Sequence, residues 1–372
     1  MTTQNDQQAL LKPNTLGGDL NLKNRIVMAP LTRCRADNPD IAPTDLHAEY
    51  YSQRASTGLL ITEGSPVSPR ANGYPNVAAI YSKAQIEGWK KVTQAVHNQG
   101  GKIFIQLWHV GRMSHPDYHN GKLPLSASAV NAGGKVRTAT GEVKEKVAPK
   151  AMTLDEIQTT HQEFLQAAQN AMEAGFDGVE LHSSNGYLFH QFFATCSNKR
   201  TDEYGGNVEN RTRFFFELLD KIKKVIPINR VGVRLNPSLN GWAGITVDET
   251  TLPTFDYIIK RLNDYDLAYL HLSEPYYSVD DVPLAEKQVT KRYRPIYKGT
   301  LMTNTKFTQE SGNRVIESGD ADLVAYGELL IANPDLAERF AQNAALNEPD
   351  RSTYYSIGAK GYTDYPFLNS EK

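Results

Sequence analysis

The segment GVELHSSNGYLFHQFF, residues 178–193, changes from apolar to polar within a few positions. An apolar run ends at residue 181, and His182, Asn185 and Tyr187 follow almost at once. Side chains of these types can donate hydrogen bonds to an oxygen and deliver a proton. They could also form an ordinary turn or a metal site, so the elements that position them decide between these interpretations.

Eight short apolar runs alternate with longer helical patterns along the chain. The runs are residues 24–30, 58–64, 102–108, 176–182, 230–236, 267–273, 298–304 and 322–328. They are apolar almost throughout, which is typical of strands covered on both faces. Ser82 with Gln85, and Thr153 with Glu156, have the spacing of helix N-terminal capping boxes between such runs.

Alternation of strands and helices predicts parallel strands joined by right-handed crossovers. Eight such units close into an α/β fold of the (β/α)₈ TIM-barrel type. The alternative, an open doubly wound sheet, is weakened because the chain contains no G-x-G fingerprint.

Two stretches do not fit a barrel unit. Residues 13–23 have Gly-Gly at their centre and predict a hairpin that plugs the barrel bottom. Residues 109–150 form a long excursion after the third strand, with two strands expected around Thr140 and Gly141. An ordered excursion on that side predicts a lid over the barrel mouth. We therefore expect one domain over residues 1–372, with residues 109–150 as a lid insertion.

The carboxyl ends of barrel strands carry the chemistry in this fold. Here they are rich in neutral hydrogen-bonding side chains and contain one inward arginine, Arg234. Such a ring suits a flat, uncharged heteroaromatic group that gains negative charge on reaction, as a flavin does at its N1–C2=O edge. Arg234 would stabilise that charge, Gln106 would match the adjacent amide edge, and Thr32 could donate to the opposite carbonyl.

Several long motifs occur in series over nearly the whole chain: MAPLTRCRA, QLWHVGR, GFDGVELHSSNGYLFHQFF, TDEYGGNVENRTRF, GVRLNP, IANPDL and GYTDYP. With these motifs the sequence resembles the old yellow enzymes, which are FMN-dependent ene-reductases. The resemblance implies a barrel that binds FMN noncovalently, is reduced by NADPH or NADH, and reduces activated alkenes such as enones, maleimides and nitroalkenes. Thr32 stands where another branch has cysteine, which implies the classical branch.

The resemblance also implies residue roles. Gln106 and Arg234 match the pair at the flavin pyrimidine edge, and Thr32 matches the threonine that tunes the flavin. The full predicted cofactor set is Ala29, Pro30, Leu31, Thr32, Gly64, Gln106, Arg234, Thr305, Lys306 and Gly327.

On the substrate side, His182 and Asn185 match the pair that holds the activating oxygen, and Tyr187 matches the proton donor. The predicted substrate-binding residues are Tyr74, Trp108, His182, Asn185 and Tyr355, and no metal site is expected.

The chain departs from the family pattern at the expected phosphate site. Thr305 replaces a usual glycine, and Glu328 replaces a frequent arginine. A glutamate facing a phosphate would be repulsive, so either it turns away or another cation compensates. We predict that Lys306 compensates, helped by backbone N–H groups near Gly327 and at the helix start after Thr308.

Other functions stay open on the residues alone. A metal-dependent barrel hydrolase could use His182 and His109, but Glu63 is the only clear carboxylate at a strand end. A Schiff-base aldolase would need a lysine ending a strand, whereas Lys102 and Lys298 fall at strand starts. A non-catalytic flavin carrier would need no proton donor at Tyr187.

Composition sets the remaining expectations. The formal net charge of −2 gives no basic face for nucleic acid or an anionic membrane. The first fifteen residues predict no secretory signal, and no apolar run is long enough to span a bilayer. Two widely spaced cysteines suit a reducing cytoplasm and cannot hold an iron–sulfur cluster. We expect a cytoplasmic monomer or homodimer, with NAD(P)H and a small activated alkene as its partners.

Overall fold

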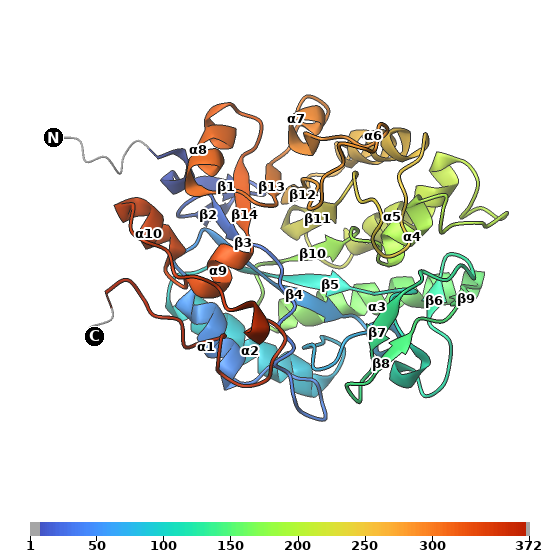
Figure 1. Cartoon of the computed structure of the whole chain (residues 1–372), viewed down its shortest axis with the longest axis horizontal. Coiled ribbons are helices and arrows are strands. Elements are labelled where there is room, and N and C mark those ends of the chain that lie inside the picture. The colour runs from blue at the N-terminus through green and yellow to red at the C-terminus, as the bar shows by residue number, and fades with distance from the viewer. Residues whose placement is uncertain (1–7, 370–372) are drawn as a thin grey trace.

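The computed structural model describes residues 8–369. Residues 1–7, where the signal-free start was predicted, and residues 370–372 of the expected domain lie outside the described residues. Eight parallel strands close into a barrel, in which the last strand pairs with the first (Figure 1). In order around the barrel they are β3 (Ile26–Met28), β4 (Leu59–Pro66), β5 (Ile103–Trp108), β10 (Gly178–His182), β11 (Val231–Leu235), β12 (Tyr269–Ser273), β13 (Leu301–Asn304) and β14 (Leu323–Tyr326). The predicted TIM barrel is confirmed, and each predicted apolar run holds one strand.

One strand differs from its prediction. β4 continues past residue 64 to Pro66, and its pairing with β5 shifts register between Ile61 and Gly64. Glu63, expected at a strand end, therefore lies inside a strand and is fully buried.

Helices cover the outside of the barrel (Figure 1). They are α1 (Asp45–Gln53), α2 (Lys83–Asn98), α3 (Leu154–Glu173), α4 (Leu188–Phe193), α5 (Val208–Ile222), α6 (Thr251–Leu262), α7 (Val289–Tyr293), α8 (Gln309–Glu317), α9 (Glu328–Ala332) and α10 (Leu336–Gln342). Both predicted capping boxes are present, with Ser82 beginning α2 and Thr153 beginning α3. The main apolar core fills the space between these helices and the strands.

The predicted N-terminal hairpin consists of β1 (Asn14–Leu16) and β2 (Leu20–Leu22). At its turn, a Cβ on Gly17 would lie 2.3 Å from the carbonyl oxygen of Asn229, which precedes β11. The hairpin therefore lies against the amino-terminal end of the barrel. Its leucines share an apolar cluster with barrel-strand residues such as Phe104 and Met302.

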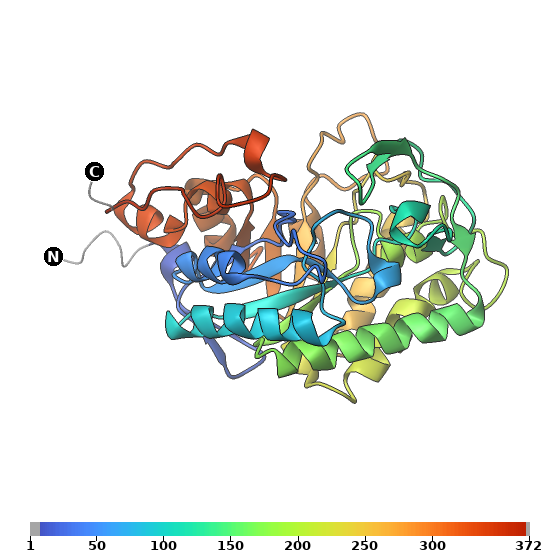
Figure 2. The same cartoon turned by 90° about the horizontal axis from the view of Figure 1, so that it is seen from below.

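The excursion after β5 carries four short strands: β6 (Leu125–Ser126), β7 (Lys135–Arg137), β8 (Val143–Glu145) and β9 (Lys150–Ala151). β7 and β8 form the antiparallel pair predicted around Thr140 and Gly141, and β6 pairs with β9 in parallel. In Figure 2 the excursion (teal and green) and the C-terminal segment (red) rise on the same side of the barrel.

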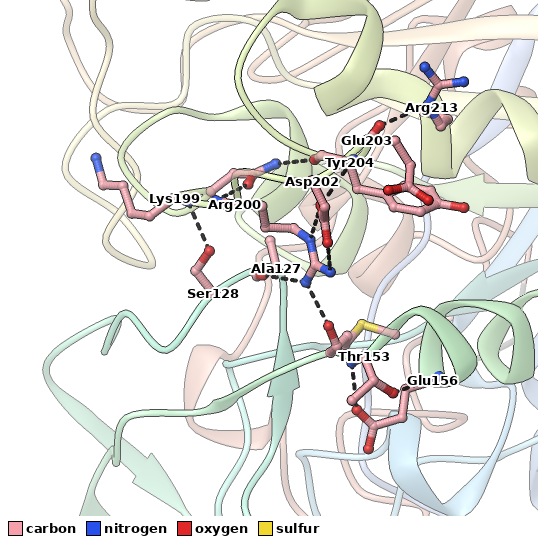
Figure 3. Close-up of polar contacts among 12 residues, drawn as sticks. Ala127, Ser128, Thr153, Glu156, Lys199, Arg200, Asp202, Glu203, Tyr204 and Arg213 are labelled. Carbon is pink, nitrogen blue, oxygen red and sulfur yellow. Dashed lines mark hydrogen bonds and ion pairs between the residues drawn. The ribbon is translucent and has the colours of Figure 1, made fainter.

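Arg200, in the loop between α4 and α5 just before the TDEYGG motif, holds the base of this excursion in place (Figure 3). Its guanidinium donates to the carbonyl oxygens of Ala127 at 3.0 Å and Met152 at 2.6 Å. The neighbouring Lys199 backbone N–H donates to the Ser128 hydroxyl at 2.8 Å. Both ends of the β6–β9 segment are thus hydrogen-bonded to the loop between α4 and α5, while β8 is exposed along its whole length.

Within residues 8–369, no helix combines the length and apolar character needed to cross a membrane. Cys34 and Cys196 are both free thiols.

Candidate active site

A cavity of about 790 Å³ opens at the carboxyl ends of β3, β13 and β14. Eight of the ten predicted cofactor residues line it: Ala29, Pro30, Leu31, Thr32, Arg234, Thr305, Lys306 and Gly327. Tyr355, predicted as a substrate-pocket wall, lines this cavity as well.

A second cavity of about 320 Å³ adjoins the first. Asn185 and Tyr187 line it, and Arg234, Asn304 and Thr305 line both cavities. Arg234 therefore lies between the cavity lined by the predicted cofactor residues and the one lined by Asn185 and Tyr187. Tyr74, Trp108 and His182 line neither of these two cavities.

Arg234 is a buried cation without a carboxylate partner among the described residues. Its guanidinium donates to the Ser273 hydroxyl at 3.3 Å and to the Asn304 side-chain oxygen at 3.1 Å. Its Nε has no hydrogen-bond partner within residues 8–369. Burial lowers the pKa of Arg234, but a guanidinium stays charged at neutral pH. A buried cation facing a cavity suits a ligand that carries or gains negative charge.

Gln106 is held from behind by a buried carboxylate. Its Nε2 donates to Glu180 at 2.7 Å, and His271 lies 2.8 Å from the other oxygen of Glu180. Burial alone would raise the pKa of Glu180, yet His271, Arg234 and Gln106 hold it below its usual value. This network fixes the carboxamide of Gln106 in one orientation and leaves its oxygen as the free group.

Gly64 is needed for close packing beside Gln106. A Cβ at this position would lie 2.7 Å from the Trp108 ring and 3.1 Å from the Gln106 side-chain oxygen. The ring of Trp108 stacks on Tyr74, with centroids 5.2 Å apart, and packs edge-on against Tyr187 at 4.9 Å. Gly64 and Gln106 thus support the mouth from within the barrel rather than lining the large cavity.

His182 ends β10 and is almost completely buried. Its Nδ1 lies 3.1 Å from the Ser184 hydroxyl. Burial, and then Arg234, hold the pKa of His182 well below its usual value. The imidazole is therefore neutral at neutral pH, with one N–H to donate.

Asn185 adopts a left-handed backbone conformation, with φ at +55°, at the turn after β10. Its side-chain oxygen accepts a hydrogen bond from Asn236 at 3.2 Å. The Nδ2 of Asn185 is consequently the group left to donate into the smaller cavity.

Tyr187 follows this turn and lies between Trp108 and His182. Its hydroxyl is 3.0 Å from that of Tyr74. Burial, and then Tyr74, raise the pKa of Tyr187 well above the ordinary value of 10. The phenol is therefore protonated at neutral pH.

The outer corner of the larger cavity has a different character. Thr305 has φ at +96° and Lys306 has φ at +56°, both in the region that favours glycine. The Lys306 ammonium donates to the Tyr276 carbonyl oxygen at 2.6 Å and lies 4.9 Å from the centre of that ring. The cation beside Glu328 is Arg351, at 3.1 Å. The role predicted for Lys306 at the phosphate stays a prediction.

Sequence reasoning gave no role to several residues that line or support this site: Glu180, Tyr276, Asn304, Trp242, His271, Ser273 and Arg351. Glu180 could have been identified from the sequence, because it lies two residues before His182 and therefore on the same face of the strand. Ser273 and Asn304 could also have been identified, because each is the last residue of its strand. Nothing in the sequence pattern indicated Arg351.

No group of three or more His, Cys, Asp or Glu side chains within residues 8–369 is placed to hold a metal ion. The donors do fit flavin mononucleotide: the Arg234 guanidinium has an unpaired Nε in this part of the chain, and Gln106 presents its carboxamide oxygen beside Gly64. A closed (β/α)₈ barrel with this mouth defines a flavin-dependent oxidoreductase.

Comparison with known proteins gives the family. Residues 9–347 match the model of the NADH:flavin oxidoreductase / NADH oxidase family, and the chain belongs to this family. A "probable flavin mononucleotide-dependent alkene reductase" of Leishmania infantum is 41% identical over 364 residues, which cover 96% of this chain and 97% of that protein.

Two solved structures are also similar. Morphinone reductase in complex with tetrahydroNAD superposes with a TM-score of 0.89 at 42% identity, over 97% of this chain and 98% of that one. The old yellow enzyme homologue from Zymomonas mobilis superposes with a TM-score of 0.91 at 40% identity, over 97% and 100%. The predicted family, the FMN cofactor, the nicotinamide reductant and the ene-reductase class of enzyme are therefore confirmed.

Proposed function

We propose that this chain reduces carbon–carbon double bonds activated by a carbonyl or nitro group, with Tyr187 as proton donor and His182 with Asn185 as the oxygen-binding pair. Bound FMN, reduced by NAD(P)H, supplies the hydride. Enones, maleimides and nitroalkenes are the expected substrates. The observation that carries the proposal is the position of Asn185 and Tyr187 around one cavity that also contains the buried charge of Arg234.

Arg234, Gln106 and Thr32 would hold the flavin ring. Because Glu180 engages the Nε2 of Gln106, the carboxamide oxygen is left to accept from an N–H of the pyrimidine edge. Arg234 would stabilise the negative charge that this edge gains on reduction, and its burial makes a fixed cation more effective.

Two neutral donors would bind the activating oxygen of the substrate. If the Ser184 hydroxyl donates to Nδ1, the ring proton of His182 lies on Nε2 and is available to the substrate. Asn185 has its oxygen occupied by Asn236 and so presents its NH₂ group. Each donor aimed at the developing oxyanion is worth about 3 kcal/mol in such sites.

Tyr187 would deliver the proton to the α-carbon. Its raised pKa keeps it protonated at neutral pH, and Arg234 favours the phenolate once the proton has left. The Tyr74 hydroxyl at 3.0 Å would hold the phenol in position.

Substitution of Tyr187 tests this assignment. We expect Tyr187→Phe to lower alkene reduction by roughly 10²- to 10⁴-fold, the usual contribution of a positioned acid. Anaerobic reduction of the bound flavin by NADPH should continue at the wild-type rate. Tyr74→Phe is the matched control, because it removes the neighbouring hydroxyl and keeps the acid.

Two outcomes would contradict the proposal. Undiminished alkene turnover in the Tyr187→Phe protein would show that the proton comes from another group. Flavin reduction without any alkene turnover by the wild-type protein would favour a flavin carrier.

We further propose a single domain whose excursion, residues 109–150, acts as a lid over the mouth. In support, the Arg112 guanidinium donates to the carbonyl oxygens of Ala243 at 2.9 Å and Gly244 at 3.0 Å, which joins the excursion to the loop after β11. A cytoplasmic location and a monomer or homodimer remain our expectations, and light scattering of the purified protein would decide the oligomeric state.

A further inference from the structure

Glu328 and Arg351 form an ion pair at the rim of the larger cavity. A guanidinium nitrogen of Arg351 lies 3.1 Å from a carboxylate oxygen of Glu328, and both residues line the cavity beside Gly327 and Thr305. The side chains are 70% and 44% exposed, respectively. An exposed pair of this kind is weak, so the guanidinium can exchange its partner at little cost.

Hydrogen bonds from two arginine side chains fix the backbone next to Arg351. The buried side chain of Arg33 donates to the carbonyl oxygen of Tyr354 at 3.1 Å and to that of Gly361 at 2.7 Å. Arg35 donates to the carbonyl oxygens of Tyr354 at 2.8 Å and Thr353 at 2.7 Å. The Arg351 backbone is therefore fixed at the rim, and only its exposed side chain is free to turn toward the cavity.

The other cation of this corner is already engaged. The Lys306 ammonium donates to the Tyr276 carbonyl oxygen and lies over the Tyr276 ring. Glu328 is the one carboxylate that lines this cavity among the described residues, so an anion that enters the corner meets a negative charge unless Arg351 lies between them. Arg351 is placed to neutralise both the Glu328 carboxylate and an anion that enters the corner.

We propose that Arg351 is the residue that binds the phosphate of the cofactor, and that Glu328 is an internal anion that holds Arg351 when no phosphate is present. The inference rests on the proposed flavin site and adds a ligand to it. The phosphate carries about −1.5 to −2 charges and offers two oxygens to one guanidinium, so it competes well against a single exposed carboxylate. Only noncovalent partners are exchanged.

Riboflavin separates the phosphate from the ring, because it shares the ring and lacks the phosphate. Full-length protein stripped of flavin is titrated with FMN and with riboflavin, and binding is followed by flavin fluorescence. We expect Arg351→Ala to raise the Kd for FMN about tenfold, as loss of a charge-assisted bidentate contact does. The Kd for riboflavin should stay within about twofold of the wild-type value.

Further variants sharpen the test. Arg351→Lys keeps the charge and loses the bidentate geometry, so it should fall between the wild type and Arg351→Ala. Glu328→Gln should bind FMN several-fold more tightly, with riboflavin unchanged. Lys306→Ala should raise the Kd for FMN less than Arg351→Ala does.

Arg314→Ala is the matched control, because Arg314 is equally exposed and pairs with Glu310 at 3.4 Å on the outer surface. Both of its Kd values should match the wild type.

The proposal is overturned if Arg351→Ala weakens FMN and riboflavin equally, if it leaves FMN binding unchanged, or if Glu328→Gln weakens FMN. A wild-type protein that binds neither flavin would instead remove the proposed function itself, so the two failures can be told apart.

Discussion

The polar side chains at the ends of β5, β10 and β11, together with Ser273 and Asn304, are buried and hydrogen-bonded to one another, whereas Glu328, just after β14, and Arg351 are exposed and form a weak pair. In the first region, which we call the inner half, Glu180 fixes Gln106 and Arg234 has two neutral partners. In the second, the outer corner, Arg351 pairs with Glu328 near the solvent. The comparison shows that a protein can bind the ring of a ligand with a rigid surface and bind its phosphate end with an adjustable one.

The largest effect on the inner half is expected from removing the Glu180 carboxylate, which accepts a hydrogen bond from Gln106. Glu180→Gln is expected to lower the free energy of unfolding by about 4 kcal/mol, since it breaks a buried charged network. Because Gln106 then loses its fixed orientation, affinities for FMN and riboflavin should fall by the same factor. Urea unfolding and flavin titration measure the two effects.

Glu310→Gln, at an exposed carboxylate, serves as the control and should change neither quantity. If Glu180→Gln weakened FMN alone, the inner half would not be the part that recognises the ring.

A second test uses the pH dependence of stability that a buried carboxyl group on β4, next to β5, should cause. Burial raises the pKa of Glu63 from 4.5 to about 7. Its folded form therefore binds more protons than the unfolded form between these values, so its stabilising contribution is complete at low pH and is lost as pH rises through 7. We expect wild-type protein to lose about 3 kcal/mol more unfolding free energy than Glu63→Gln between pH 4.5 and 8.

Urea unfolding at fixed ionic strength measures this difference. Parallel pH profiles for wild type and Glu63→Gln would show that Glu63 stays ionised in the folded protein.

The smallest expected effect lies in the outer corner and has the opposite sign. Thr305 adopts φ at +96°, where a β-branched residue is strained. Thr305→Gly should relieve that strain and, after the entropic cost of glycine, raise the free energy of unfolding by about 1 kcal/mol. The urea midpoint measures the change, and a lower midpoint would show that the Thr305 side chain stabilises this corner.

Much of the inner half could be predicted from sequence. The apolar runs gave the strands, and the rule that chemistry follows strand ends located Arg234, His182 and Gln106. Glu180 does not stand out in a strand whose other residues are mostly apolar, although its position two residues before His182 places both on one face.

The outer corner was harder to predict for a physical reason. Its charge balance depends on a contact between Glu328 and Arg351, 23 residues apart in different segments. Lys306 follows its strand directly and was therefore the natural expectation, yet in the structure its ammonium is bound to the carbonyl of Tyr276. Contacts between irregular segments leave no periodic pattern in the sequence.

The pairing of β14 with β3, and the grip of Arg33 and Arg35 on residues 353–361, have a consequence for biosynthesis. A nascent chain cannot complete the barrel until residue 326 has left the ribosome, and the wall that carries Tyr355 forms later still. The vitamin-derived group can therefore bind its complete site only after residue 361 has emerged, so it binds a closed barrel rather than an early folding intermediate.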